Sequence, residues 1–162
     1  MSLEFSAESK ERIAALLQKY PTKMAATLPV LWIAQEQFGW VSEDAVRLVA
    51  ATLEVPESHV HGVATFYTMY NKKPVGRLHI QVCTNISCML CGSDGTLEAF
   101  EKRCGLKAGQ TNEDFTLQEV ECLAACGTAP AVQINDKYYE PVQADDVPAL
   151  VDRLLAETKE GA

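Results

Sequence analysis

The six cysteines of this 162-residue sequence are its clearest candidates for chemistry, because all of them lie between Cys83 and Cys126. Three of them fall within nine positions, in the stretch VCTNISCMLCGSDG (82–95). Thiols gathered in this way can form structural disulfides, bind a zinc ion, act as a reactive dithiol or hold an iron–sulfur cluster. The rest of the sequence has to decide among these four kinds of site.

Charge and composition exclude several classes of protein. The sequence has 22 acidic and 14 basic side chains, which gives a net charge of −8. An acidic surface repels phosphate, so we expect no nucleic-acid partner. No apolar run approaches the roughly 20 residues that span a bilayer, and the first residues lack the pattern of a secretory signal or a transit peptide. We therefore expect a cytoplasmic bacterial protein, or a processed organellar one, without direct membrane insertion; metal or redox roles for its cysteines are favoured over disulfides.

The first 70 residues have the apolar spacing of helices. Their caps and breaks predict four helices: from Ser6 to about Tyr20, from about Met24 to Phe38, one after Ser42 and one after Pro56. The segment ATFYTMY (64–70) gathers aromatic and methionine side chains, which suit either the core or a partner interface.

The periodicity changes after NKKPVG (71–76). We predict strands over 77–83 and 115–122, a helix over 94–104, a hairpin turning at Asn135–Asp136 and a last helix capped by Asp145. The predicted fold class is α/β: an N-terminal helical bundle followed by a thioredoxin-like β-α-β-β-β-α domain. We place the two domains at 1–72 and 76–160.

Two cysteine pairs follow the ends of the two predicted strands. Cys83 ends the first and is followed by Cys88, while Cys122 ends the second and is followed by Cys126. Parallel strands bring their carboxyl ends to one edge of a sheet, so four thiols can meet there. Spacers of four and three residues are wider than those of zinc knuckles, and favour a [2Fe–2S] cluster with two thiolates per iron.

Other readings of the cysteines stay open. The set Cys83, Cys88, Cys91 and Cys122 has the spacing of a plant-type ferredoxin, which would leave Cys126 without a role. A dithiol enzyme would use Cys88 and Cys91 as a C-x-x-C motif, with Pro130 matching the cis-proline of thioredoxin-like folds. A zinc-bound interaction module is a further alternative.

The remaining candidates have ordinary structural explanations. Cys104 lies on the apolar side of its helix and is expected to pack as a small hydrophobic residue. Cys91 is expected to be a spare thiol near the site. The three histidines show no ligand-like spacing, and we expect structural or surface roles for them. No glycine-rich phosphate loop or hydrolase elbow is present, so we expect no nicotinamide or flavin on this chain.

With these residues assembled, the sequence resembles the E-type subunits of bacterial NADH-quinone oxidoreductase (complex I), the thioredoxin-like [2Fe–2S] ferredoxin family. The resemblance covers nearly the whole chain and depends on the following motifs in order: LPVLWIAQEQFGWVS, HGVATFYTMY, VCTNISCMLCGSDG and VECLAACGTAPAVQIND. It implies one [2Fe–2S] cluster on Cys83, Cys88, Cys122 and Cys126. Cys91 departs from the pattern of that family.

The resemblance also implies partners and a location. A protein of this family is a non-catalytic electron-transfer subunit: it exchanges single electrons with the flavin of an NADH-oxidising subunit of the F type, which carries the FMN and the NADH site. It implies further peripheral-arm subunits, and a cytoplasmic position peripheral to the inner membrane through the complex. Similar subunits serve NAD-linked hydrogenases and formate dehydrogenases, which are the alternative assemblies.

Overall fold

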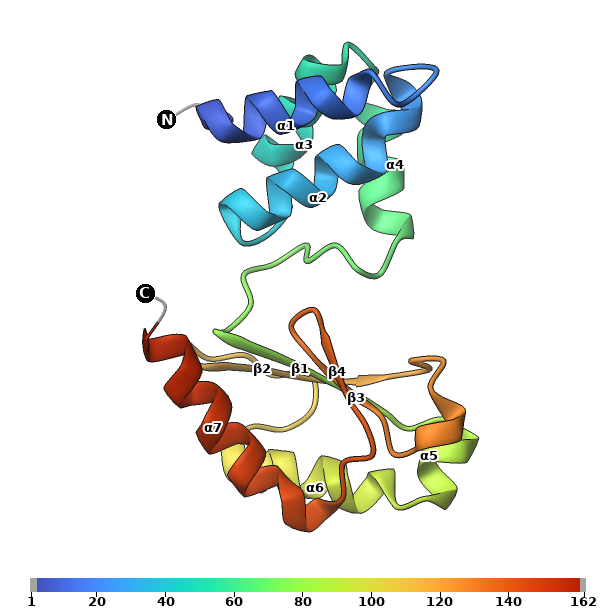
Figure 1. Ribbon diagram of the computed structural model, residues 1–162, viewed down its shortest axis with the longest axis vertical. Helices are drawn as coiled ribbons and strands as arrows, with labels where there is room; N and C mark the ends of the chain where they lie inside the picture. Colours follow the sequence, from blue (N-terminus) through green and yellow to red (C-terminus); the bar gives the residue numbers. More distant parts are fainter. Residues whose placement is uncertain (1–2, 161–162) are drawn as a thin grey trace. The chain divides into compact units, whose positions relative to one another are not determined.

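The computed structural model describes residues 3–160 and divides the chain into two compact units, the first ending at Pro74 and the second beginning at Val75 (Figure 1). Within the described residues there are seven α-helices, three short 3₁₀ helices and four strands. They are α1 (Ala7–Leu17), η1 (Met24–Ala26), α2 (Thr27–Phe38), α3 (Glu43–Leu53), α4 (Glu57–Phe66), β1 (Leu78–Cys83), α5 (Ile86–Leu90), α6 (Ser93–Cys104), β2 (Phe115–Val120), η2 (Cys126–Thr128), β3 (Val132–Ile134), β4 (Lys137–Tyr139), η3 (Ala144–Asp146) and α7 (Val147–Glu160).

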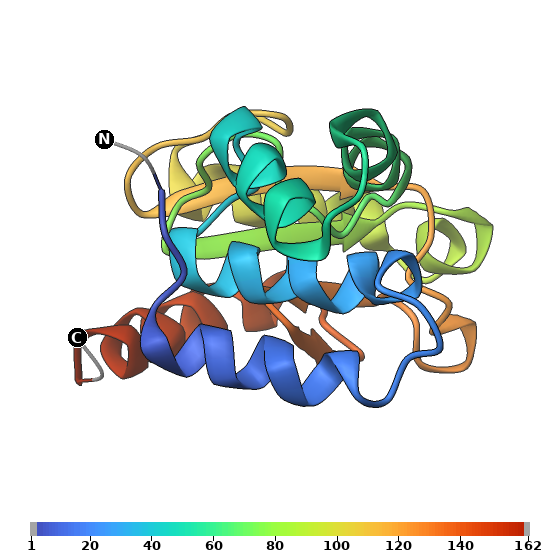
Figure 2. The same ribbon diagram turned by 90° about the horizontal axis from the view of Figure 1, so that it is seen from above.

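Some helix ends of the first unit lie where their caps predict, but α1 ends at Leu17 and not at Tyr20, and the 3₁₀ helix η1 precedes α2, which begins at Thr27. The side chains of Ser6 and Ser42 accept hydrogen bonds from the backbone of Ser9 and Ala45, at the starts of α1 and α3. Gly39 ends α2 with a φ of 80°, a left-handed conformation that glycine adopts without a steric penalty. In Figures 1 and 2, α1 and α2 lie side by side.

The first unit has its own apolar core, to which all four helices contribute. Tyr70 belongs to this core: it is 1% exposed, and its hydroxyl donates a 2.7 Å hydrogen bond to the carbonyl of Leu28. Burial raises the pKa of the Tyr70 phenol well above its usual range. By contrast, Phe66 is 77% exposed and Met69 is exposed as well. The segment 64–70 therefore divides between core and surface.

The second unit is a mixed α/β fold around a four-stranded sheet of order β2-β1-β3-β4. β1 and β2 are parallel neighbours, and β3 pairs antiparallel with both β1 and β4. The hairpin between β3 and β4 turns at Asn135 and Asp136, as predicted. α6 and α7 cover one face of the sheet (Figure 1), where Ile80, Val82 and Phe100 are buried in a second apolar core.

Three sequence predictions in this unit need correction. A short helix, α5, precedes α6, so the order is β-α-α-β-β-β-α rather than β-α-β-β-β-α. β2 ends at Val120, so Cys122 follows the strand instead of ending it. Asp145 does not cap the last helix, because it lies inside η3; Gln143 and Asp146 form the capping box there.

Candidate metal centre

The parallel pairing of β1 and β2 brings two cysteine-bearing loops to one edge of the sheet. Cys83, the last residue of β1, is in register with Val120, the last residue of β2. The backbone N–H of Thr84 then donates to the carbonyl of Val120 at 3.3 Å, and the Thr84 hydroxyl donates to a carboxylate oxygen of Glu119 at 2.7 Å. The loops that carry Cys88 and Cys122 therefore leave the sheet side by side.

The first loop folds into α5 because Asn85 caps it. The Asn85 side chain accepts a 2.7 Å hydrogen bond from the backbone N–H of Ile86. The backbone carbonyl of Asn85 accepts another, at 2.8 Å, from the backbone N–H of Met89. This turn directs Cys88 inward, where it is 3% exposed, while Ile86 and Leu90 are exposed. The Asn85 cap is the sequence signal that could have predicted this helix.

Cys83 and Cys88 lie in a small apolar cluster with Leu123 and Ala131. The backbone N–H of Cys83 donates to the carbonyl of Ala131 at 3.1 Å. Burial raises the pKa of the Cys88 thiol; a backbone hydrogen bond from Ala131 lowers it, and the neighbouring thiols of Cys83 and Cys126 raise it. Cys83, Cys88 and Cys126 are therefore close enough to interact, although they come from both loops.

The second loop presents its thiols to solvent. Cys122 and Cys126 are both exposed, and Cys126 begins η2. The backbone N–H of Ala124, a residue with a left-handed φ of 57°, donates a 3.2 Å hydrogen bond to Cys122 Sγ. The structure thus brings Cys126 toward the first pair, whereas Cys122 is held by its own loop. An N–H···S bond of this kind stabilises a thiolate ligand.

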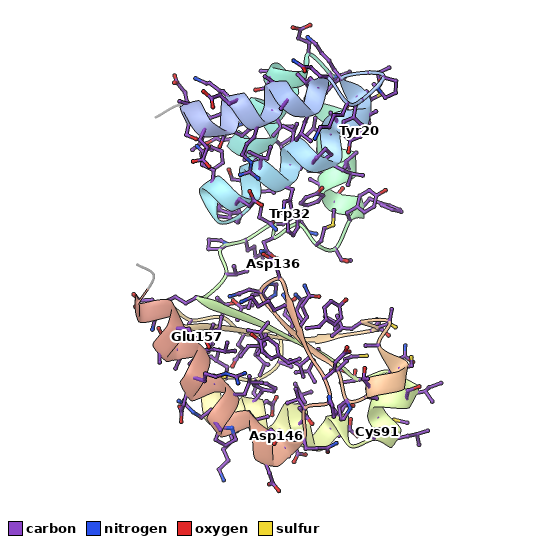
Figure 3. The ribbon with its side chains drawn as sticks, viewed as in Figure 1. Tyr20, Trp32, Cys91, Asp136, Asp146 and Glu157 are labelled. Atoms are coloured by element: carbon purple, nitrogen blue, oxygen red, sulfur yellow. The ribbon has the colours of Figure 1, made fainter. Side chains whose placement is uncertain are left out.

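The two other cysteines occupy different environments. Cys91 follows α5 and is exposed, with its backbone N–H hydrogen-bonded to the carbonyls of Ser87 and Cys88 (Figure 3). Cys104 is buried in the core of the second unit, and burial raises its thiol pKa to about 11. The predicted core role of Cys104 is confirmed. The exposure of Cys91 is compatible with both predicted ligand sets, the one that contains Cys126 and the one that contains Cys91 in its place.

The number and type of these donors match what a binuclear cluster needs. Within residues 3–160 no group of three or more His, Cys, Asp or Glu side chains is arranged to hold one metal ion. A [2Fe–2S] cluster contains two iron atoms and needs two thiolate ligands on each of them. The cysteines of residues 3–160 are all free thiols, and two loops at one sheet edge each supply a pair with amide N–H groups beside them. Ala129 and Ala131 surround the buried pair with small side chains.

Two of the three histidines form side-chain hydrogen bonds within their own units, and the third lies at the surface. His59 Nε2 lies 3.2 Å from the hydroxyl of Thr27, and His79 Nε2 lies 3.1 Å from Gln118 Oε1. His79 is buried in β1, and burial lowers the pKa of its imidazole. His61 is exposed on α4. The structural and surface roles predicted for the three histidines are confirmed.

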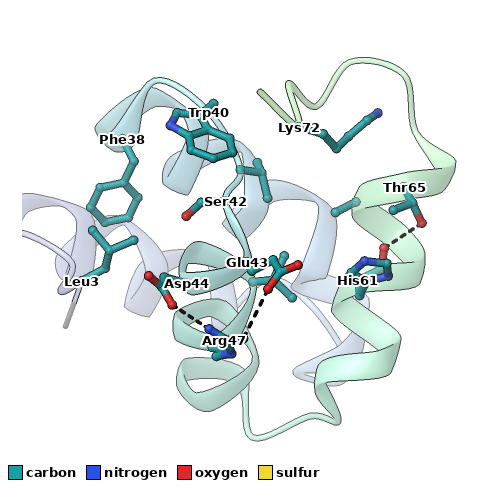
Figure 4. Close-up of a pocket in the computed structure, with 13 residues that line it drawn as sticks. Leu3, Phe38, Trp40, Ser42, Glu43, Asp44, Arg47, His61, Thr65 and Lys72 are labelled. Carbon is teal, nitrogen blue, oxygen red and sulfur yellow. Dashed lines mark hydrogen bonds and ion pairs between the residues drawn. The ribbon is translucent and has the colours of Figure 1, made fainter. Parts of the chain in front are cut away.

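A cavity of about 900 Å³ in the first unit lies among aromatic and charged side chains, and three of its charged residues, Glu43, Asp44 and Arg47, are paired with one another (Figure 4). Arg47 Nη1 lies 2.7 Å from Asp44 and its Nη2 lies 3.4 Å from Glu43. The Thr65 hydroxyl donates to the backbone carbonyl of His61 at 2.8 Å. Among the described residues that line this cavity we find no arrangement of a nucleophile with a base.

Comparison with known proteins identifies the class to which this fold and site belong. The sequence matches the family described as thioredoxin-like [2Fe-2S] ferredoxin over residues 13–155. The chain belongs to this family.

Individual relatives are similar over almost their whole length. The E-type subunit of NADH-quinone oxidoreductase from Rickettsia felis is 46% identical over 159 residues, which cover 94% of this chain and 95% of the relative. Its counterpart from Rickettsia conorii is 48% identical over 144 residues, 86% of each chain. A further E-type relative, from Rhizobium meliloti, is 40% identical over 149 residues, covering 91% of this chain and 89% of the relative.

The fold is also found in a solved structure of a different assembly. A chain of an NAD⁺-reducing [NiFe]-hydrogenase in its air-oxidized state superimposes with a TM-score of 0.69 at 19% identity, covering 82% of this chain. This chain spans only 23% of the length of that hydrogenase chain. The similarity therefore concerns the fold alone.

Proposed function

We propose that this chain is the [2Fe–2S] electron-transfer subunit of an NADH-quinone oxidoreductase, with the cluster held by Cys83, Cys88, Cys122 and Cys126. The observation that carries the proposal is the parallel pairing of β1 and β2, which brings two cysteine pairs to one sheet edge. The identity of 46–48% to E-type subunits of NADH-quinone oxidoreductases supports the choice of assembly.

Each part of the site has a distinct task in this proposal. Cys83 and Cys88 supply a buried pair of ligands from one loop, and Cys122 and Cys126 supply a pair from the other. When bound, a [2Fe–2S] cluster accepts and releases one electron at a time. The N–H groups of Ala124 and Ala131 donate to ligand sulfurs and offset the negative charge of four thiolates. The exposure of Cys122 and Cys126 leaves one side of the site open to a partner.

The proposal assigns the chemistry of NADH to another chain. A flavin-binding subunit of the F type would hold the FMN and the NADH site, and the present chain would exchange single electrons with that flavin without catalysing hydride transfer itself. Further peripheral-arm subunits would hold it on the cytoplasmic side of the inner membrane. Among residues 3–160 no helix combines the length and the apolar character needed to cross a bilayer.

The same type of electron-transfer chain in an NAD-linked hydrogenase is the second candidate, favoured by the shared fold with the NAD⁺-reducing hydrogenase chain. The two assemblies differ in the electron acceptor, so purified complexes distinguish them: quinone-dependent NADH oxidation supports the first, and hydrogen-dependent NAD⁺ reduction supports the second.

The cofactor itself is tested on the anaerobically purified chain. We expect about two iron atoms and two sulfides per chain, with a red-brown absorption that dithionite bleaches. A colourless protein with bound zinc would support the interaction module instead, and a metal-free protein that reduces insulin disulfides would support the dithiol enzyme.

A further inference from the structure

We propose that the groove between α1 and α2 is a docking site for an amphipathic helix of a partner chain, with carboxylates along one edge of that helix. The groove has a volume of about 610 Å³. Its lining residues come from two helices and one loop of the first unit: Arg12, Ala15, Leu16 and Lys19 of α1 and its C-terminal end; Leu28, Pro29, Trp32 and Ile33 of α2; and Met69.

The shape of the groove fits a helix. The lining residues from α1 and its C-terminal end follow the spacing i, i+3, i+4, i+7, so they form one continuous face about two turns long. Those of α2 repeat every four residues along the opposite wall. α1 and α2 lie side by side in both views (Figures 1 and 2), and their lining residues form the two walls of the groove. A helix that presents apolar side chains on one face fills such a groove.

The floor of the groove is apolar and accessible. Trp32, which projects from α2 in Figure 3, is only partly buried, as are Leu16 and Leu28. Met69 is 46% exposed beside them. A partly exposed tryptophan beside an exposed methionine is a combination enriched at protein interfaces.

The charged residues that line the groove indicate the charge of the partner that would bind there. The sequence carries a net charge of −8, yet the lining residues include two cations and no acid. Arg12 forms a 2.6 Å ion pair with Glu36, whereas no ion pair of Lys19 is found within residues 3–160. Arg12 and Lys19 lie seven residues apart on one face of the α1 segment, about 10 Å along its axis. A partner helix with Asp or Glu at positions seven apart would pair one carboxylate with Lys19, while the other would share Arg12 with Glu36.

The test places a photoreactive benzoyl-phenylalanine at Ala15, which lines the groove, and at Ala51, an exposed alanine of α3 outside it, in the complex assembled in cells. We expect cross-linking from position 15 alone, to a helical segment of another subunit that carries acidic residues seven apart. Lys19→Glu is expected to reduce the yield roughly five- to tenfold. Lys10→Glu makes the same charge change on α1 outside the groove and is expected to leave the yield unchanged.

Three results would overturn the proposal. They are cross-links from position 15 to this chain or a second copy of it, cross-links to a segment without acidic residues, and equal effects of Lys19→Glu and Lys10→Glu. The visible spectrum of each variant reports on the cluster separately, so failure of the groove proposal does not depend on failure of the proposed function.

Discussion

Ala131 connects the two buried thiols of the site: its carbonyl accepts the N–H of Cys83 at 3.1 Å, and its backbone hydrogen-bonds to the thiol of Cys88. Ala131 is itself fully buried, and it follows the cis Ala129–Pro130 peptide bond. A residue outside the cysteine motif therefore fixes the positions of both candidate ligands of the first loop.

The first prediction concerns the size of that residue. Ala131→Val adds two methyl groups where Cys83, Cys88 and Leu123 already pack, and we expect it to lower the free energy of unfolding by about 1–3 kcal/mol. It should also lower the iron content, because Cys88 has to move. Ala51→Val makes the same change on an exposed face of α3 and should cost no more than about 0.6 kcal/mol, with full iron content. Unaltered iron and stability in Ala131→Val would contradict this account of the buried pair.

The second prediction concerns the entry to β1. A Cβ on Gly76 would lie 2.5 Å from backbone atoms of Phe115, and the Gly76 N–H donates a buried 2.8 Å hydrogen bond to Thr116 Oγ1. We expect Gly76→Ala to destabilise the chain by about 3 kcal/mol or more, because the backbone at the start of two paired strands must separate.

Gly62 provides the matched control, since it lies in α4 with nothing within 4 Å of its added Cβ. Gly62→Ala should stabilise the chain by about 0.5–1 kcal/mol. Thermal unfolding of the two variants measures both effects. Equal melting temperatures of the two variants would show that the close approach of the backbones at Gly76 and Phe115 does not require a glycine.

The third prediction is a pH dependence caused by His79. Burial lowers the pKa of this imidazole in the folded chain, while the unfolded chain has the ordinary value of about 6.5. As the pH falls below about 6.5, His79 therefore binds a proton in the unfolded chain before it does so in the folded chain. The free energy of unfolding should then decrease as the pH falls toward the lower pKa of the folded chain.

The variant His79→Gln removes this group. Its free energy of unfolding, measured in urea, should therefore depend less on pH below about pH 6.5 than that of the wild type. Gln118 and Asp136 are the groups that favour the protonated ring. The same slope in both proteins would show that another group causes the dependence.

The fourth prediction separates Cys104 from the site. Because its thiol is buried and its pKa is about 11, Cys104 should resist alkylation by iodoacetamide at pH 8 in the folded chain, whereas the exposed Cys91 should react. Cys104→Ser should lower the free energy of unfolding by about 1–3 kcal/mol without changing the iron content. Rapid labelling of Cys104 in the folded chain would contradict its place in the core.

Local chemistry explains the parts of the fold that could be predicted. The Ser6 and Ser42 caps, the Gly39 stop and the Asn135–Asp136 turn are each confirmed, because each depends on one or two residues and their neighbours. The position of Cys83 at the end of β1 is confirmed for the same reason. The domain limits 1–72 and 76–160 and the four-ligand set stay predictions.

Other features depend on contacts that the sequence pattern does not contain. β2 ends at Val120 because its last pairing partner is Cys83, so Cys122 lies in the loop and not in the strand. Ala131 comes from the segment before β3 and reaches Cys88 only through the antiparallel pairing of β3 with β1. The groove between α1 and α2 likewise exists only once the two helices pack together.

The most direct test of the central claim is the EPR spectrum of the dithionite-reduced, anaerobically purified chain, compared between Cys126→Ser and Cys91→Ser. If the cluster is held by Cys83, Cys88, Cys122 and Cys126, Cys91→Ser should keep the one-electron signal of the wild type, and Cys126→Ser should lose or reshape it. The reverse result, with the signal kept in Cys126→Ser and lost in Cys91→Ser, would contradict the account and favour the ligand set that includes Cys91.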